Sequence, residues 1–451
     1  MFTTYLQNHL QQLSGNKFII IIWISILFSA CNIFQQARKP VPVVEEEKKE
    51  EVQQEITIVP DTTQAMKDSI AIAKKLEEIE KTKWAKKDSY NIAFILPFSI
   101  DAEELYYLMD NENVTTYQPL AAITFYEGAL QALDTLRKLH INLEVFTFDV
   151  AKDSIKMQKL INSGALDAMD VLIGPIFNEC LIPAAQFAKE KEIFLISPLS
   201  PSQSITEKNP FYVLMNPTLT TQLQKIASYL QNKRITTNTI IISQEGMALE
   251  QNLAEDFKNA LQGNMYKSYS GSITLVTSIS ELQNSIKPGI ENYIFIASLD
   301  ELFVNQLLRS ISLASRNENI SVIGLSGILN FETVSLDYLE SLHFQYPESY
   351  YIDRLAPRTL RFKNDFIAKY DAAPDDYAAR GFDITLYTGF LLNANGPDIR
   401  KGFNSAKPVQ YLLGPLRFTE VKNAADSTEY FENSGVTLLR LSNYRFEKVV
   451  D

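Results

Sequence analysis

The chain has few of the residues that hold metals, form disulfides or bind nucleic acid. Among 451 residues there are two cysteines and three histidines, which excludes a disulfide framework and leaves few ligands for a zinc site. Lys and Arg number 42 against 54 Asp and Glu, and the resulting net charge of −12 argues against a nucleic-acid binder with a basic face. Walker-type and Rossmann glycine patterns are missing from the sequence, so a nucleotide cofactor is not expected. A metal is not expected either, because His and Cys ligands are few.

What the chain does have is enough apolar residues for a large core. Hydrophobic residues make up 46% of the sequence and charged residues 21%, which excludes a mainly disordered protein. A chain of this length is expected to divide into two lobes or domains.

An apolar run near the N-terminus is typical of a secretory signal. The run Phe18–Phe28 is too short for a membrane-spanning helix, but it suits the apolar centre of a signal peptide. It leads into Ser29-Ala30-Cys31, where small residues before a cysteine resemble the cleavage site of a bacterial lipoprotein. We therefore expect residues 1–30 to be removed and Cys31 to carry a lipid that anchors the protein stably. The alternative is an uncleaved N-terminal anchor.

The segment after Cys31 predicts a tether in the cell envelope. Asn32 stands where an Asp would resemble an inner-membrane retention signal, so the resemblance to lipoproteins favours the outer membrane, facing the periplasm. Residues 31–62 are rich in charged residues and cannot bury apolar area, which predicts a disordered tether. Residues 63–88 carry apolar side chains at spacings of three and four, which predicts a stalk helix, with partner binding as its alternative role.

From residue 89 the pattern alternates between short apolar strands and amphipathic helices. Strands are predicted at 91–97, 142–149, 170–174 and 193–197, and again at 239–243, 273–277, 293–297 and 321–325, with helices between them. Such alternation predicts parallel sheets, and its repetition predicts an α/β fold of two doubly wound lobes. We expect lobe 1 to comprise 89–215 and 346–395, and lobe 2 to comprise 216–345 and 396–451.

Several short motifs follow one another in a fixed order along this body. They are Ile95-Leu-Pro-Phe-Ser99, Leu172-Ile-Gly-Pro175, Ile196-Ser-Pro-Leu-Ser200, the segment 211–217 and Arg380-Gly-Phe-Asp-Ile-Thr-Leu-Tyr387. In order and spacing they resemble type I periplasmic binding proteins, the fold of branched-chain amino-acid receptors. More narrowly, the chain is similar to lipoproteins of Bacteroidetes-type bacteria that join this fold to a LysM module, whose place the tether takes here.

The resemblance implies two functions. The first is a non-enzymatic protein that closes two lobes on a small polar ligand, with an ABC-type permease as partner. The second follows from outer-membrane lipoproteins of this fold that bind and activate a cell-wall synthase, a penicillin-binding protein, without a small ligand.

The predicted site lies where loops follow the carboxyl ends of the strands, because ligands bind there in open parallel sheets. One rim comprises Ser99, Gly174, Pro175, Phe177, Asn178, Ser197 and Ser200, and the facing rim comprises Gln244, Glu245, Asp300 and Ser326. For each residue the alternative is an ordinary turn, since Ser and Asp routinely cap helices.

The ligand class is left open by departures from the amino-acid receptors. Those receptors hold the ligand carboxylate with hydroxyl and backbone N–H groups after the third and fourth strands, and its ammonium with an acid of the second lobe. Here Pro201 removes a backbone donor, and Glu245 or Asp300 would have to supply the acid. An amino acid, a peptide and a cell-wall fragment all stay open as ligands.

Cys180 is the thiol that the mature body would keep. It begins an apolar helix, so we expect a buried small hydrophobic residue. The alternative is a thiol whose pKa is lowered by the helix N-terminus.

Overall fold

The computed structural model describes residues 82–99, 118–233, 235–263, 269–314, 319–403 and 411–449. The predicted signal, Cys31, the tether and residues 63–81 of the predicted stalk helix lie outside these ranges. Within them, no helix combines the length and the apolar character that a membrane span requires.

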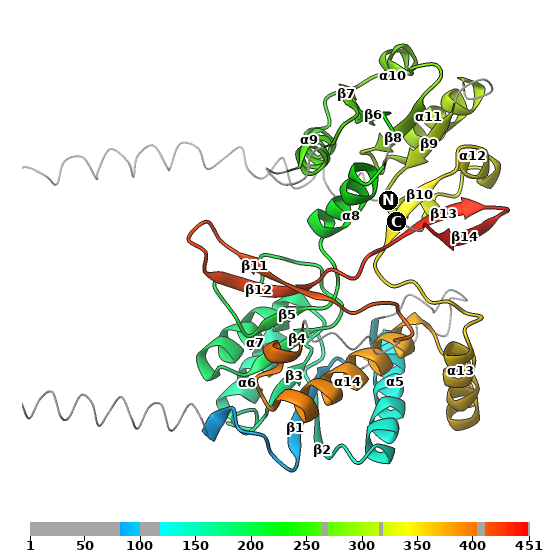
Figure 1. The fold of residues 1–451 in the computed structure, drawn as a ribbon. Coiled ribbons are helices and arrows are strands. Elements are labelled where there is room, and N and C mark those ends of the chain that lie inside the picture. Colours follow the sequence, from blue (N-terminus) through cyan, green and yellow to red (C-terminus); the bar gives the residue numbers. More distant parts are fainter. Residues whose placement is uncertain are drawn as a thin grey trace, which may run out of the picture. The chain divides into compact units, whose positions relative to one another are not determined.

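The first lobe is built on a seven-stranded sheet with the order β11-β12-β5-β4-β3-β1-β2 (Figure 1). Its strands are β1 (Tyr90–Leu96), β2 (Leu143–Asp149), β3 (Val171–Ile173), β4 (Phe194–Ser197), β5 (Tyr212–Leu214), β11 (Phe418–Lys422) and β12 (Thr428–Asn433). Neighbours pair in parallel, except that β11 is antiparallel to β12. Its helices are α5 (Gln118–Lys138), α6 (Ser154–Asn162), α7 (Asn178–Lys191), α13 (Pro357–Tyr370), α14 (Asp376–Asn395) and the 3-10 helix η4 (Ile399–Gly402).

The second lobe repeats this plan with the strand order β14-β13-β10-β9-β8-β6-β7. Its strands are β6 (Thr237–Ile242), β7 (Ser272–Val276), β8 (Glu291–Ile296), β9 (Ile320–Ile323), β10 (Gln345–Glu348), β13 (Thr437–Ser442) and β14 (Arg445–Lys448). Its helices are α8 (Leu219–Gln231), α9 (Ala248–Gln262), α10 (Ile279–Ser285), α11 (Glu301–Ala314), α12 (Leu336–Ser341) and the 3-10 helix η3 (Ser326–Asn330). The prediction of two doubly wound, mostly parallel sheets is therefore confirmed.

The lobe boundaries differ from the expected ones near the C-terminus. We assigned all of 396–451 to lobe 2, but β11 and β12 pair with the first sheet, and the chain passes to the second sheet only between β12 and β13. The strand β10, Gln345–Glu348, belongs to the second sheet, so the expected boundary at 345/346 falls inside a strand. Aromatic packing explains the placement of β11, because Phe418 stacks on Phe403 with ring centroids 4.8 Å apart.

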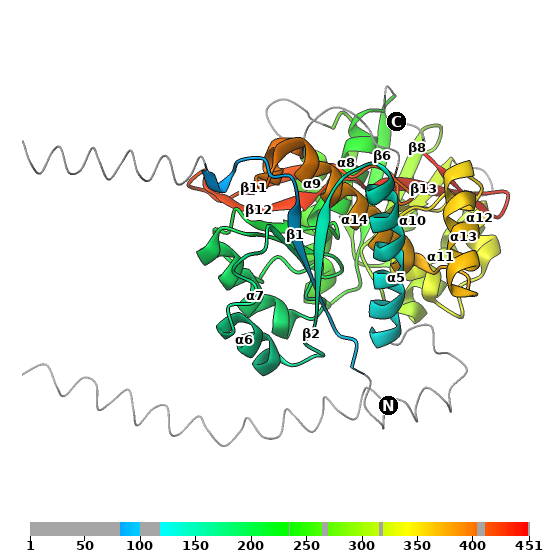
Figure 2. The ribbon, with the colours of Figure 1, turned by 90° about the horizontal axis from the view of Figure 1, so that it is seen from below.

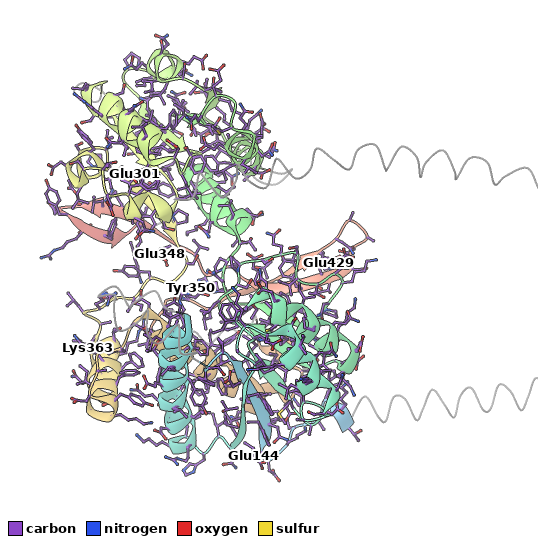
Figure 3. All side chains as sticks on the ribbon, turned by 180° about the vertical axis from the view of Figure 1, so that it is seen from behind. Glu144, Glu301, Glu348, Tyr350, Lys363 and Glu429 are labelled. Atoms are coloured by element: carbon purple, nitrogen blue, oxygen red, sulfur yellow. The ribbon has the colours of Figure 1, made fainter. Side chains whose placement is uncertain are left out.

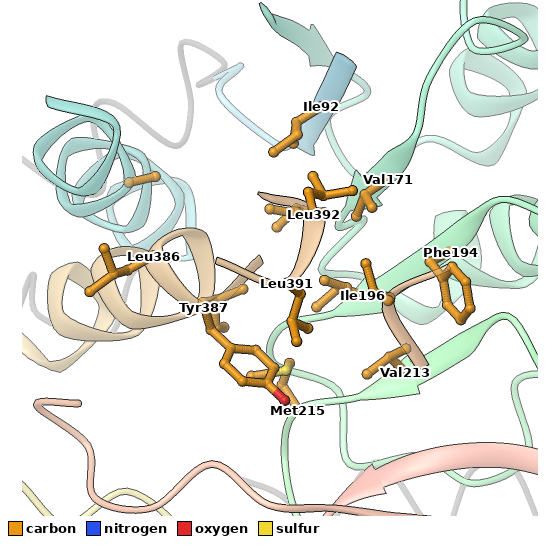
Figure 4. Packing of buried hydrophobic residues seen from close by; sticks show 14 of the residues in the cluster. Ile92, Val171, Phe194, Ile196, Val213, Met215, Leu386, Tyr387, Leu391 and Leu392 are labelled. Carbon is orange, nitrogen blue, oxygen red and sulfur yellow. The ribbon is translucent and has the colours of Figure 1, made fainter. Parts of the chain in front are cut away.

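The core of the first lobe lies on both faces of its sheet. Ile92 and Phe94 of β1 pack on the side of α5 and α14, and the alternate residues Ala93 and Ile95 pack on the side of α6 and α7. Figure 4 shows Leu391 of α14 beside the strand residue Ile196, and Leu392 near Val171. Strands buried on both faces are typical of parallel sheets, which is why the sequence shows them as continuous apolar runs.

The N-terminal end of the described chain is fixed to the first lobe where β4 and β5 begin. The Trp84 ring stacks on Phe211 at a centroid distance of 6.1 Å, and the Arg400 guanidinium lies 5.8 Å from the Trp84 ring. The Lys87 ammonium also forms an ion pair with the buried Asp170, at 2.6 Å. The last residues of the predicted stalk are therefore part of the folded body.

Helices α5 and α14 cross with their backbones in contact, and both views of the ribbon show them side by side (Figures 1 and 2). A Cβ atom built on Gly128 would lie 1.8 Å from the carbonyl oxygen of Ala378, and one built on Gly381 would lie 1.8 Å from that of Phe125. Only glycine fits at these two positions, so this pair of glycines sets the distance between the helices.

We expect Gly381→Ala to destabilise the protein. The added methyl group would overlap the Phe125 carbonyl, and overpacking of this kind costs about 1–3 kcal/mol, more than the roughly 1 kcal/mol that Ala gains over Gly in a helix. Asn393→Ala, on the exposed side of α14, serves as the control and should change the free energy of unfolding by no more than about 0.5 kcal/mol. Equal urea midpoints for the two variants would contradict the prediction.

A buried carboxylate joins α14 to the segment 411–413. The side chain of Asp383 is 1% exposed, and its two oxygens accept from the backbone N–H groups of Leu412, at 3.0 Å, and Leu413, at 2.8 Å. Burial raises the pKa of Asp383 to about 7, against the lowering effects of these two donors and of Arg358.

Asp383→Asn should therefore reduce the pH dependence of stability. In the unfolded chain this carboxyl titrates near its ordinary pKa of about 4, so between about pH 4 and pH 7 the folded state holds a proton that the unfolded state has lost. The resulting stabilisation is complete below about pH 4 and is lost as the pH rises to about 7, by on the order of a few kcal/mol. Urea unfolding at about pH 5 and pH 8 should show a steeper loss for the wild type than for D383N, and parallel profiles would disprove the assignment.

Candidate functional site

The first sheet reverses its strand order between β1 and β3, and the loops that follow these two strands diverge there. In open α/β sheets such a switch point is where ligands bind. Gly174 ends β3 with φ at +92°, and a Cβ on it would lie 2.1 Å from the carbonyl oxygen of Ile95. The peptide bond from Gly174 to Pro175 is cis. These two predicted residues therefore shape the turn next to the switch point.

A pocket of about 390 Å³ opens at the carboxyl ends of these strands. The loops after β2, β3 and β4 and the first turns of α5, α7 and α14 supply its lining, which comprises Ala121, Lys152, Ile176, Phe177, Asn178, Glu179, Leu199, Ser200, Pro201, Tyr377 and Arg380. Three predicted site residues, Phe177, Asn178 and Ser200, are thus brought together in one pocket. Its walls combine apolar surface with charged and amide groups, as small-molecule sites do.

The cations of this pocket are held against aromatic rings. The Arg380 guanidinium lies 4.0 Å from the centroid of the Tyr350 ring and 5.4 Å from that of Tyr377. The Lys152 ammonium lies 5.2 Å from the centroid of the Phe177 ring. Figure 3 marks Tyr350 on the segment that follows β10. Stacking fixes the direction of a guanidinium and leaves its N–H groups free to donate.

The start of α7 adds partial positive charge to the same wall. Its N-cap residue is Phe177, whose side chain accepts no hydrogen bond from the first turn. A helix N-terminus without a side-chain cap favours an acceptor or an anion from elsewhere. The pocket is therefore positive in character, with the exposed Glu179 as the acid in its lining.

The three predicted serines of the first lobe have different surroundings. Ser99 donates to the carboxylate of Asp149, and the Ser200 hydroxyl donates to Asn178 Oδ1 at 2.8 Å. Ser197 is fully buried at the end of β4, and within the described ranges its hydroxyl has no hydrogen-bond partner. Only Ser200 lines the pocket.

Asp149 organises the loop that carries Ser99. Its Oδ1 accepts from the N–H groups of Phe98, at 3.1 Å, and Ala151, at 2.9 Å, in addition to the Ser99 bond on Oδ2. Partial burial tends to raise the pKa of Asp149, but these hydrogen bonds outweigh it and the pKa is lowered. Asp149 is therefore an ionised structural acceptor.

The predicted residues of the second lobe follow the carboxyl ends of β6, β8 and β9. Asp300 accepts from the N–H of Phe303 at 2.8 Å, so it caps α11 as the alternative interpretation expected. Gln244 donates its N–H to Glu250, whereas Glu245 and Ser326 are exposed. The pocket described above includes none of these four residues.

Four charged or aromatic residues of the pocket were not predicted from the sequence, and one of them, Glu179, directly follows the predicted Asn178. Tyr377 and Arg380 come from α14, which follows the first four strands by more than 150 residues in the chain. Lys152 follows β2 by three residues and could have been found as a charge beyond a strand end. The signal for Arg380 was weaker, namely a cation in an otherwise apolar helical stretch.

Cys180 lies in the core of the first lobe. Cys180 is fully buried, and burial followed by the nearby Glu179 raises the pKa of its thiol to about 11, so it is a neutral core residue. Among the described residues, no group of three or more His, Cys, Asp or Glu side chains could hold a metal ion.

Comparison with known proteins assigns the fold. Residues 105–314 match the model of a family described as the receptor family ligand binding region. The structure is similar to that of a putative branched-chain amino acid ABC transporter from Rhodospirillum rubrum, at 15% identity over 80% of this chain and 100% of that chain, with a TM-score of 0.57. It is also similar to a branched chain amino acid ABC transporter periplasmic ligand-binding protein from Burkholderia xenovorans LB400, at 13% identity over 80% and 94% of the two chains, with a TM-score of 0.51.

The chain therefore has the fold of the type I periplasmic binding proteins, as its motifs predicted. The comparison with curated proteins gave no match.

Proposed function

We propose that this protein is a non-enzymatic periplasmic solute-binding protein that holds a small polar ligand in the first-lobe pocket. The observation that supports this most strongly is the 390 Å³ pocket at the switch point of the first sheet, lined by loops after three strands. Ligand sites of open α/β sheets lie at this position. Of the two solved structures described above, one is a putative branched-chain amino acid ABC transporter and the other is a periplasmic ligand-binding protein of such a transporter, which supports the same role here.

The pocket belongs to one lobe, so we further propose that the second lobe closes over it. The chain passes between the two sheets after β5, after β10 and between β12 and β13. Three such crossings could act as a hinge, because a few residues at element ends can absorb the rotation. An ABC-type permease would receive the ligand from the closed form.

The same proposal includes a lipid anchor at Cys31 in the outer membrane, facing the periplasm. It is supported by the apolar run Phe18–Phe28, the small residues before Cys31 and the charged segment after it. A multiply acylated cysteine is sufficient for stable anchoring.

Ligand binding should be detectable as a gain in stability of the full chain. We expect at least one compound among amino acids, short peptides and cell-wall fragments to raise the free energy of unfolding, by about 2.7 kcal/mol at a concentration of 100 Kd. Asn178→Trp, which fills the pocket, should abolish the effect. Glu190→Trp, at the exposed far end of α7, should leave the effect intact. A panel without any stabilising compound in thermal-shift and calorimetric assays would overturn the proposal.

Cys31→Ser should abolish lipidation and attachment through a lipid. Intact-mass measurement of the wild-type protein should show a chain that begins at Cys31 and carries acyl groups, and the protein should partition into detergent. The variant should keep the signal segment and gain no acyl mass. A wild-type protein that retains residues 1–30 without acyl mass would support an uncleaved anchor instead.

A further inference from the structure

The predicted serines of the first lobe do not supply free hydroxyl donors for an anion. Ser99 and Ser200 donate their hydroxyl hydrogens to Asp149 and Asn178, and Ser197 is buried within the sheet. Pro201, the residue after Ser200 in the pocket wall, has no N–H to offer. A ligand carboxylate would therefore find no free serine donor among the predicted hydroxyls of the first lobe.

Arg380 offers such a donor, and its position is built into the core. Its guanidinium stacks on Tyr350, which is 8% exposed and packs in one cluster with Phe362, Phe366 and Ala378. Its Nε is buried, and no group of the described chain accepts a hydrogen bond from it. A guanidinium that is partly removed from water, and whose Nε has no acceptor within the described ranges, is costly unless an anion binds to it.

The charges around Arg380 leave the pocket with a positive excess. Lys152 is the second cation of the lining, and its ammonium contacts the Phe177 ring. Glu179 is the acid of the lining, and it is exposed to solvent. A zwitterionic ligand would bring an ammonium group into a site that already has more positive than negative charge.

Among the described residues of the second lobe, no acidic side chain is buried that could compensate. Glu250 accepts from the Gln244 N–H at 2.9 Å and from the Ser298 hydroxyl at 2.5 Å, so both of its oxygens are used within its own lobe. Asp300 caps α11 through Phe303. The amino-acid pattern of one anion site and one ammonium site is therefore incomplete in the described residues of both lobes.

We infer that the pocket takes a net-anionic solute, with a carboxylate or phosphate group bound to the Arg380 guanidinium and a second contribution from Lys152. The planar guanidinium can donate two parallel hydrogen bonds to such a group, and the tyrosine rings keep it oriented. This inference rests on the proposed function. It narrows the ligand class to anions without an ammonium group, which excludes ordinary amino acids.

Calorimetry on the full chain in detergent tests the ligand class with defined probes. The probes are glutarate and phenylacetate as carboxylates, inorganic phosphate, and leucine as the zwitterion. We expect at least one anionic probe to bind about tenfold or more tightly than leucine, and its affinity to fall as the salt concentration rises. A preference for glutarate or phenylacetate over phosphate identifies the group as a carboxylate, and the reverse preference identifies a phosphate.

Variants of Arg380 test the residue. Loss of a charged hydrogen-bond pair predicts about 10- to 100-fold weaker binding of the anionic probe to R380Q, with partial retention in R380K. Arg354→Gln is the matched control, because the Arg354 side chain is 75% exposed, pairs with Asp376 and lies outside the pocket. The affinity of this variant for the anionic probe should change less than about twofold. Urea unfolding of R380Q and R380K checks that both variants are folded.

The outcomes separate the inference from the proposed function. Leucine binding more tightly than every anion, or R380Q and R380K binding the anion as the wild type does, overturns the inference and leaves a solute-binding protein. Binding of none of the four probes to the wild type overturns the inference, and if the wider panel of amino acids, peptides and cell-wall fragments also fails, the proposed function falls with it.

Discussion

The close crossing of α5 and α14 is the constraint on which the first lobe depends. Gly128 and Gly381 let the two backbones touch, and the rest of α14 is positioned from that contact. At the crossing itself, Tyr377 and Arg380 reach the pocket, and just after it Asp383 holds the segment at Leu412 and Leu413. Farther along, Leu391 and Leu392 cover the sheet. The helix α14 therefore contributes to the pocket wall, holds the segment 411–413 and covers the sheet. A change in its distance from α5 would affect all three.

The strands were predictable because their information is local. Strands buried on both faces must be apolar throughout, so runs such as those of β1 and β8 are visible in the sequence without knowledge of their partners. The same holds for α5, whose apolar face repeats at helical spacing. What the sequence could not show was pairing. The strands β11 and β12 are only partly buried and carry polar residues, and nothing local indicates that they join β5 rather than the second sheet.

The candidate site was predictable in position but not in chemistry. Parallel-sheet geometry alone predicted that Phe177, Asn178 and Ser200 lie at one edge of the sheet, and all three line the pocket there. Whether a hydroxyl there is free depends on neighbours such as Asp149, and these neighbours are decided by loop conformation. Arg380 was missed for another reason, since it reaches the pocket from a helix that packs over the sheet only in the folded chain. The strand ends that surround the pocket were therefore predictable from the sequence, whereas the charge that Arg380 brings to it was not.

The docking of Trp84 determines how the first lobe is presented to its surroundings. Its ring lies against Phe211 and Phe194, where β4 and β5 begin, whereas the pocket lies where these strands and their neighbours end. β4 has four residues, so its two ends lie roughly 13 Å apart. Any pull transmitted along the preceding chain therefore acts on the far side of the sheet from the pocket. In a chain held by its N-terminus, the point of attachment would therefore lie at the end of the sheet opposite the pocket. The attachment itself would not cover the mouth of the pocket.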